Sequence, residues 1–357
     1  MAITRITGTQ TKAILKLGTQ ATAYGTAVAG GSGDRIRGNI SPSYQSQELT
    51  KNPIGSGLTM QDDVIKGRLT PTVTLAMDLG FQNGADKLAA QFFSTSSVPV
   101  EQTVGKSDYL HRFTMNVAPN NIFATFAYEL TTAKVAELPS CAVRSFATSF
   151  GGTNEIVQLS AELLGNDLVL DSATNTNATI TSATVADSEC VIVKLEDQFL
   201  LNLQSGDALD SGDQFNIVSY SRTLNRPQDF SGQVKGSAGN PKPLADEMIT
   251  GTLSVTLEAL DDITLFEAWD AETAYKCALI IEGSATASGG DNRSWSEYTP
   301  RMKLVQAPQY NVTDSGYNSV TLNFVIMEAS ANPTGMSSTL PYVEVINTKS
   351  TNYILAS

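Results

Sequence analysis

Residues 252–257 (TLSVTL) decide the fold class, because polar and apolar side chains alternate at every position. The same alternation occurs at residues 72–77 (TVTLAM), 158–163 (QLSAEL) and 321–324 (TLNF). A period of two places the apolar side chains on one face of a strand and the polar side chains on the other. The sequence therefore predicts a mainly β protein whose sheets are buried on one face and wet on the other.

Two short helices are expected beside these strands. Residues 85–93 place apolar side chains at the i, i+3, i+4, i+7 and i+8 positions of one helical stripe. Asn83 is a candidate N-cap for this helix. A second helix is predicted from residue 261, with apolar side chains at every third position up to Trp269. Each predicted helix directly follows an alternating strand.

The same order of motifs occurs twice along the chain. A Gly-Asp segment is followed by an alternating strand, a short helix, an apolar strand that ends in Glu, and a proline before the last strands. The matched segments are residues 33–36 and 212–215, 65–69 and 249–253, 73–75 and 255–257, 123–129 and 278–282, and Pro139 and Pro300. This order favours a tandem duplication over two unrelated β domains that share a strand-helix-strand order.

The 357 residues suit two domains of ordinary size. We expect a first domain at residues 1–165, a polar linker or exposed hairpin at 166–189, a second domain at 190–333 and a C-terminal extension at 334–357. Residues 45–63 and 221–247 lack periodicity and lie between corresponding strands of the two halves. Loops of this length are usually functional or disordered, and their equivalent positions favour a function.

The composition excludes several function classes. Hydrophobic residues make up 41 % of the chain, which is enough to support a core. The net charge of −13 and the absence of a basic run argue against binding to duplex nucleic acid. The acidic balance suits either simple solubility or a surface that stays near nucleic acid without binding it. No apolar stretch is long enough for a membrane span, and the N-terminus lacks the apolar core of a signal peptide.

Few residues are available for catalysis or metal binding. His111 is the single histidine and no GxSxG motif occurs, so a histidine-dependent triad is not expected. Cys141, Cys190 and Cys277 are too few and too widely spaced for a disulfide framework or a zinc site. The acidic residues of 207–213 lack EF-hand spacing and predict a turn. We therefore expect no enzyme, cofactor or metal, although a carboxylate pair for glycoside hydrolysis stays open because its separation depends on the fold.

Several segments resemble the tail tube proteins of tailed bacteriophages. They are residues 13–16 (AILK), 24–27 (YGTA), 33–36 (GDRI), 203–213 (LQSGDALDSGD) and 224–227 (LNRP). The resemblance implies two tandem β-sandwich or split-barrel domains, each with one short flanking helix. It also implies a structural virion protein that forms stacked rings around a lumen through which DNA passes without specific binding. Rings of this family usually hold six such domains, so a two-domain chain is expected to form trimeric, pseudo-hexameric rings.

The resemblance also implies a location and partners. The chain is expected in the virion tail after assembly in the cytoplasm of the host bacterium. Its expected partners are further copies of itself, a tape measure protein, a tail terminator, and distal tail or baseplate proteins. A head decoration or baseplate protein, a glycan-binding β-sandwich module and a carboxylate-based hydrolase are the alternatives.

Two sets of residues are candidates for function. The polar strand faces are candidates for the lumen wall, with contact to outer solvent as the alternative; they comprise Thr72, Thr74, Asp78, Gln158, Ser160, Glu162, Thr252, Ser254, Thr256, Glu258, Thr321 and Asn323. The two long segments are candidates for stacking between rings, through Lys51, Asn52, Pro53, Ile54, Arg226, Pro227, Phe230 and Pro241.

Overall fold

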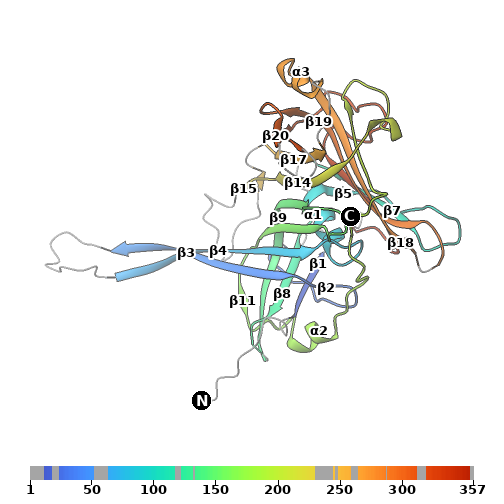
Figure 1. The fold of residues 1–357 in the computed structure, drawn as a ribbon. Helices are drawn as coiled ribbons and strands as arrows, with labels where there is room; N and C mark the ends of the chain where they lie inside the picture. Colours follow the sequence, from blue (N-terminus) through green and yellow to red (C-terminus); the bar gives the residue numbers. More distant parts are fainter. Residues whose placement is uncertain are drawn as a thin grey trace.

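A computed structural model describes residues 12–17, 24–51, 63–116, 122–131, 133–229, 244–245, 248–258, 264–286, 288–311 and 319–353. The prediction of a mainly β protein is confirmed (Figure 1). The helices are α1 (Ala85–Phe93), α2 (Asn177–Ser182) and α3 (Thr264–Asp270). The strands are β1 (Ala13–Leu17), β2 (Arg35–Ile36), β3 (Asn39–Lys51), β4 (Asp63–Asp78), β5 (Ser94–Ser96), β6 (Val100–Glu101), β7 (Tyr109–Met115), β8 (Ala124–Glu129), β9 (Val135–Phe150), β10 (Gln158–Leu164), β11 (Val169–Leu170), β12 (Gln198–Leu203), β13 (Gln214–Phe215), β14 (Ile217–Asn225), β15 (Gln228–Asp229), β16 (Leu244–Ala245), β17 (Thr250–Glu258), β18 (Ala274–Ala285), β19 (Asn292–Leu304), β20 (Gln309–Asn311), β21 (Ser319–Ile326) and β22 (Tyr342–Asn347).

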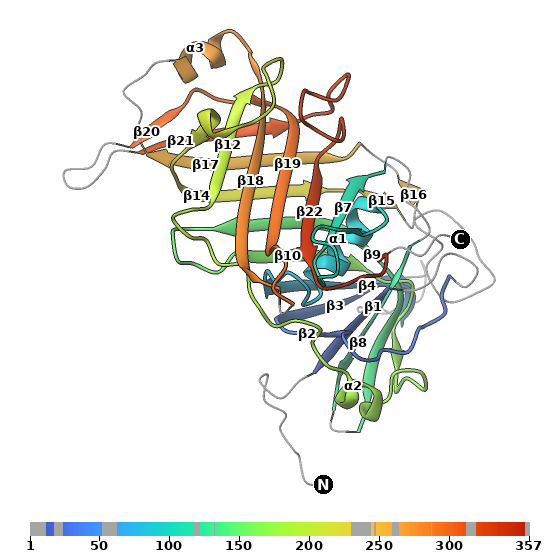
Figure 2. The same ribbon diagram turned by 90° about the vertical axis from the view of Figure 1, so that its right-hand side faces the viewer.

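One layer of the fold is a continuous antiparallel sheet that runs through both halves of the chain. Its strand order is β3-β4-β10-β9-β14-β17-β21-β20. The halves meet where β9 pairs with β14. We call this layer the long sheet (Figure 2).

Strands of the second layer cross the long sheet at a steep angle (Figure 2). In the first half these strands follow the order β2-β1-β8-β9-β11, and in the second half the order β13-β12-β18-β19-β22-β7. The long strand β9 belongs to both layers, because its first part pairs with β8 and its last part with β10 and β14. The core lies between the layers, where Phe146, Leu159, Val255, Leu322 and Trp295 are almost completely buried.

The two predicted helices are present as α1 and α3, and the first was predicted with the right bounds. The N-cap of α1, however, is Gly84 rather than Asn83. Gly84 has a φ of 115°, a left-handed conformation that glycine adopts readily. The Asn83 side chain instead donates from Nδ2 to the Asp78 carbonyl oxygen at 3.1 Å, which fixes the turn before the helix. Residues 261–263, where the second helix was predicted to begin, lie outside the described residues.

The segments predicted as aperiodic loops contain regular structure at their ends. β3 and β4 stay paired as far as Lys51 and Asp63, and this pair extends beyond the sandwich (Figure 1). A strand pair that leaves the core has no apolar face to bury, so the alternation that predicts strands is not required there. Within residues 166–189 the chain forms β11 and α2, whose N-cap is Thr176. None of the helices in the described ranges is long and apolar enough to cross a membrane.

Candidate functional site

The long sheet presents one polar face to the outside. All twelve residues predicted to line a lumen lie on this face, as the strand registers show. Asp78 pairs with Gln158, for example, and Ser254 pairs with Asn323. The opposite face of the same strands carries the core. We call the outer surface the polar face.

Strands β9 and β14 contribute further residues that the sequence reasoning did not select. Ser145 and Ser149 on β9 stand opposite Asn225 and Ser221 on β14, and all four belong to the polar face. The alternation of these strands is interrupted in sequence by Thr148 and Arg222, which are polar but point into the core. Residues 145–150 (SFATSF) nevertheless carry a weak period of two that could have identified the strand.

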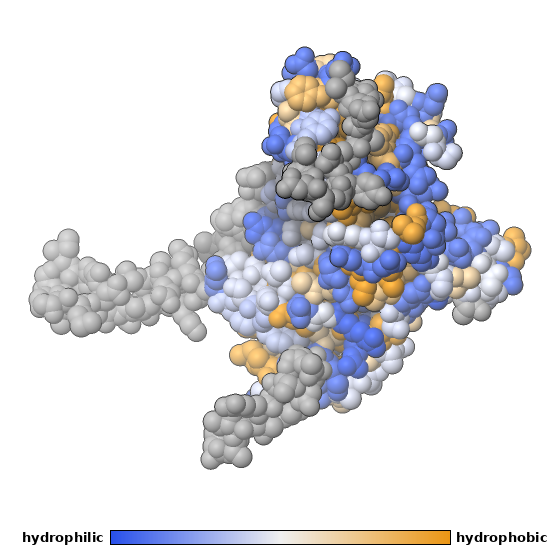
Figure 3. All heavy atoms as spheres, viewed as in Figure 1, coloured by the Kyte–Doolittle hydropathy of each residue, from blue (hydrophilic) through white to orange (hydrophobic). Residues whose placement is uncertain are grey.

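Most side chains on the polar face are short and neutral. Its hydroxyl groups bond to each other, as Thr256 Oγ1 and Thr321 Oγ1 do at 3.1 Å. The surface at the base of the β3–β4 pair is correspondingly pale, which marks residues of intermediate hydropathy (Figure 3).

Three carboxylates, Asp78, Glu162 and Glu258, lie among these neutral residues. Gln158 Nε2 donates to Asp78 Oδ1 at 2.9 Å, and Arg144 Nη1 lies 3.7 Å from Glu162 Oε1. No group of His, Cys, Asp and Glu residues suited to a metal ion occurs in the part of the chain that the structure describes. A neutral to weakly acidic surface of this kind has little to offer a phosphate group, which is bound by lysine, arginine and backbone N–H groups.

A buried ion pair of the second half lies behind the polar face, next to the junction with the first half. Arg222 Nε on β14 lies 2.9 Å from Glu297 Oε2 on β19, and both side chains are 1 % exposed. The same carboxylate accepts hydrogen bonds from Tyr220 Oη at 2.9 Å, Thr148 Oγ1 at 3.0 Å and Trp295 Nε1 at 3.0 Å. Since Thr148 comes from β9, the network fixes the junction of β9 with β14. Burial, followed by the charge of Glu297, raises the pKa of Tyr220 and keeps its hydroxyl protonated.

Arg226, a candidate for stacking between rings, is buried at this junction as well. Its Nη1 donates to Ser94 Oγ at 2.9 Å and its Nη2 to the Asn116 carbonyl oxygen at 2.8 Å. The guanidinium also lies over the ring of Phe92, and burial lowers the pKa of Arg226 to about 10. Its guanidinium therefore binds within the chain.

Of the other stacking candidates, the structure describes only Pro227 and Lys51. Pro227 is half-buried, and Lys51 ends β3. The remaining candidates lie outside the described residues; they are Asn52, Pro53, Ile54, Phe230 and Pro241.

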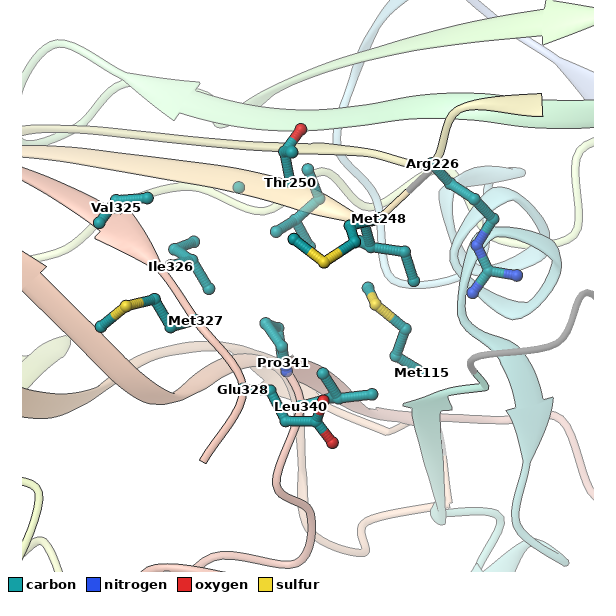
Figure 4. Close-up of a pocket in the computed structure, with 13 residues that line it drawn as sticks. Met115, Arg226, Met248, Thr250, Val325, Ile326, Met327, Glu328, Leu340 and Pro341 are labelled. Carbon is teal, nitrogen blue, oxygen red and sulfur yellow. The ribbon is translucent and has the colours of Figure 1, made fainter. Parts of the chain in front are cut away.

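An apolar pocket of about 500 Å³ opens at one end of the second half, where β14 and β21 end and β17 begins (Figure 4). Met115, Met248 and Leu340 line it, and the guanidinium of Arg226 points away from it (Figure 4). The lining is mostly aliphatic and includes no histidine or cysteine. Nothing in its chemistry indicates catalysis.

The histidine and two of the cysteines considered for catalysis are buried in the core. His111 is buried, and its Nε2 lies 2.8 Å from the Lys349 carbonyl oxygen. Burial lowers the pKa of His111 and favours the neutral ring. The thiols of Cys141 and Cys277 are free and buried, and burial raises the pKa of each to about 12. A thiol with so high a pKa is a poor nucleophile at neutral pH.

The acidic segment forms the predicted turn. Residues Ser211–Asp213 make one turn of 3₁₀ helix. Asp210 caps it by accepting a hydrogen bond from the Gly212 N–H at 2.7 Å. These carboxylates therefore hold a turn between β12 and β13.

Comparison with known proteins agrees with the resemblance seen in the sequence. Residues 10–326 match the family described as phage tail tube protein. A search of curated proteins found no match. Because the matched region covers most of the sequence and both halves of the long sheet, the chain belongs to the phage tail tube protein family.

Proposed function

We propose that three copies of this chain close into a ring, that the rings stack into the tail tube, and that the polar face lines a channel through which the genome passes. Family membership makes the chain a structural component of the virion tail that self-assembles into a tube. The number of chains per ring, the lining of the channel and the passage of DNA are the proposed parts. The observation that carries them is a repeated pattern of strand pairing.

The two halves of the chain use the same pattern of pairing. β1 pairs with β2 and β8, as β12 pairs with β13 and β18. The order β8-β9-β10-β4-β3 in the first half corresponds to β18-β19-β21-β17-β14 in the second. β11 lies on β9 as β22 lies on β19. This correspondence supports a tandem duplication.

The residue registers support the same correspondence. We match Pro139 on β9 with Pro300 on β19 and follow the strand pairings outward from these residues. On the side of β8 and β18, the pairings end at the two Gly-Asp segments, residues 33–36 and 212–215, which resemble each other in sequence. The residues matched in this direction are Ala127 and Ala278, Ile14 and Leu200, and Arg35 and Gln214.

In the other direction the registers reach the long sheet. They match Leu163 with Phe324, Val73 with Leu253, and Pro42 with Arg222. The match of Val73 differs by two residues from the one suggested by sequence, which paired it with Val255. A shift of two keeps every side chain on the same face of the strand.

A chain with two such units has the ends that a ring requires. Within the described residues β3 pairs with β4 alone, and β20 pairs with β21 alone, so both ends of the long sheet have a free edge. Free edges are normally protected, because they can pair with another chain. A head-to-tail contact between different edges closes a ring when the rotation fits. Three chains supply six units, the number usual in this family.

The polar face suits the inner wall of such a ring. Short hydroxyl side chains make few strong contacts with phosphate, and Asp78, Glu162 and Glu258 repel it. The formal net charge of −13 acts in the same direction. We expect DNA to move along this surface without specific binding, and we expect a tape measure protein, a tail terminator and distal tail or baseplate proteins as further partners of the tube.

Thiol labelling of assembled tubes tests this assignment. Ser160→Cys lies on the polar face, and Ser182→Cys lies on exposed α2 in the second layer. Both variants carry Cys190→Ser, which removes the partly exposed native thiol. A maleimide attached to a polymer wider than the channel should label both thiols in free chains, and only the one at position 182 in closed tubes. Equal labelling of both positions in tubes would refute the channel assignment.

A further inference from the structure

We infer that β20 of one copy pairs with β3 of the next in the register that β9 and β14 use inside the chain, with Gln309 opposite Ser43. This inference rests on the proposed ring and specifies its junction. The partner is a second copy of this chain, and the template is the junction already present between the two halves.

The internal junction supplies the register. In it, Ala147 stands opposite Thr223 and Thr148 stands opposite Arg222. Thr223 pairs with Thr252 on β17 as Ser43 pairs with Thr72 on β4, so Ser43 occupies the place of Thr223.

The other strand of the junction is matched in the same way. Ala147 pairs with Ser160 on β10, and Gln309 pairs with Thr321 on β21. The registers of the long sheet match Ser160 with Thr321, so Gln309 occupies the place of Ala147. Copying the internal junction to the free edges therefore places Gln309 opposite Ser43.

The backbone of β3 has the orientation that this register requires. The Gly165 N–H donates to the Pro71 carbonyl oxygen at 2.9 Å, so the backbone of Pro71 faces β10. Backbone groups alternate along a strand, and those of Thr72 therefore face β3 and its partner Ser43. The backbone groups of Pro42 and Tyr44 then face the free edge.

The internal template has the same orientation. The Arg226 N–H donates to the Arg144 carbonyl oxygen at 2.8 Å, so the backbone of Arg226 faces β9, and so do those of Leu224 and Arg222. Arg222 is the counterpart of Pro42. The pairs Ala147–Thr223 and Ser43–Gln309 are consequently of the non-hydrogen-bonded kind, in which side chains lie closest.

The junction between copies lacks two features of the internal one. Pro42 takes the place of Arg222 and Ala136 that of Glu297, so the buried ion pair has no counterpart. The pairing of β22 with β7 has no counterpart either. In the first half β7 lies between α1 and β8, whereas in the second half only a few residues separate α3 at Asp270 from β18 at Ala274, so that no strand equivalent to β7 lies between them. Pro42 also offers no N–H to the free edge, so the junction between copies has one ladder hydrogen bond fewer than the internal one. We therefore expect rings to separate into whole chains.

Disulfide trapping tests the register. Gln309→Cys is combined in turn with Ser41→Cys, with Ser43→Cys and with Gln45→Cys. Each variant also carries Cys190→Ser, and the assembled tubes are oxidised. Directly opposite positions fall within the Cα separation that a disulfide allows, whereas positions two residues away do not. We expect the 43–309 pair to give a closed covalent trimer and the other two pairs to lose nearly all of this product.

The internal junction provides the matched control. Ala147→Cys with Thr223→Cys should form a disulfide within one chain, which produces no covalent oligomer. Ala147→Cys with Ser221→Cys should form no disulfide. If microscopy shows rings but cross-linking is strongest at position 41 or 45, the register is wrong and the ring stands. If the internal disulfide forms but neither rings nor intermolecular products appear, both the register and the proposed ring are wrong.

Discussion

At the scale of single residues, burial of charge gives the largest effects. Arg222 and Glu297 of the second half are each 1 % exposed and form an ion pair, and Glu297 also accepts a hydrogen bond from Thr148 of the first half. Removing one member of a buried ion pair leaves the other charge without a partner, which costs about 3–5 kcal/mol. Replacing both members with neutral groups avoids that cost. The bond from Thr148 to Glu297 links this buried network to the first half.

Glu297→Gln should lower the free energy of unfolding by about 3 kcal/mol, because Arg222 stays charged in the core. The double variant Arg222→Met with Glu297→Gln should recover part of this loss. Urea denaturation measures both, with Glu196→Gln as the control because that side chain is 73 % exposed. A loss for Glu297→Gln no larger than that of the control would contradict a role for the pair at the junction.

Neutralising Asp78, Glu162 and Glu258 together should slow genome ejection a few-fold, because exposed charges interact with energies of about 0.2–1 kcal/mol each. The rate of DNA release from particles that carry the variant tube measures this. Neutralising three exposed carboxylates elsewhere (Glu196, Asp207 and Glu267) is the control and should leave the rate unchanged. An equal effect of the two triple variants would count against a role of the polar face in DNA passage.

The lowered pKa of Lys349 predicts that the free energy of unfolding depends on pH. Burial lowers the pKa of Lys349 to about 8 from its ordinary value of 10.5, although Asp86 opposes the shift. Between these two values the unfolded chain binds more protons than the folded chain, so the free energy of unfolding rises with pH. Lys349→Met should remove part of this rise between pH 8 and 10, as thermal unfolding can show. Lys134→Met changes a lysine that is 57 % exposed and should leave the rise intact.

At the scale of elements, the sequence predicts what packs against the core. The strands containing residues 72–77, 158–163, 252–257 and 321–324 and helix α1 were predicted because each buries one regular apolar face. β14 escaped prediction because Arg222 stands where an apolar residue is expected, and its partner Glu297 is distant in sequence. The projecting part of the β3–β4 pair escaped because it has no core to face. The junction of β9 with β14 depends on long-range pairing that no local pattern encodes.

Two loop replacements test the stacking role of the long segments. Lys51 pairs with Asp63, so an Asn-Gly turn can replace residues 52–62 and keep the hairpin. Asp229 pairs with Leu244, so the same turn can replace residues 230–243. Either variant should form rings or single chains but no long tubes in negative-stain images. Tubes of normal length from both variants would exclude these segments as the stacking contacts.

At the scale of the whole molecule, the long sheet carries the features on which the proposed assembly rests. Two units with matching registers are joined by β9 and β14, and the strands at the two ends have free edges among the described residues. A sheet with a polar face on one side and a core on the other can close around a channel by repeating the same contact. The family match accounts for the tube, and the proposed duplication predicts how many chains form one ring.

Cryo-electron microscopy of assembled tubes tests this most directly, by counting chains in one ring. We predict three chains per ring, six copies of the repeated unit around the channel, and Ser160 and Ser254 on its inner wall. Rings of six chains, or a channel lined by any surface other than the polar face, would contradict the proposed assembly.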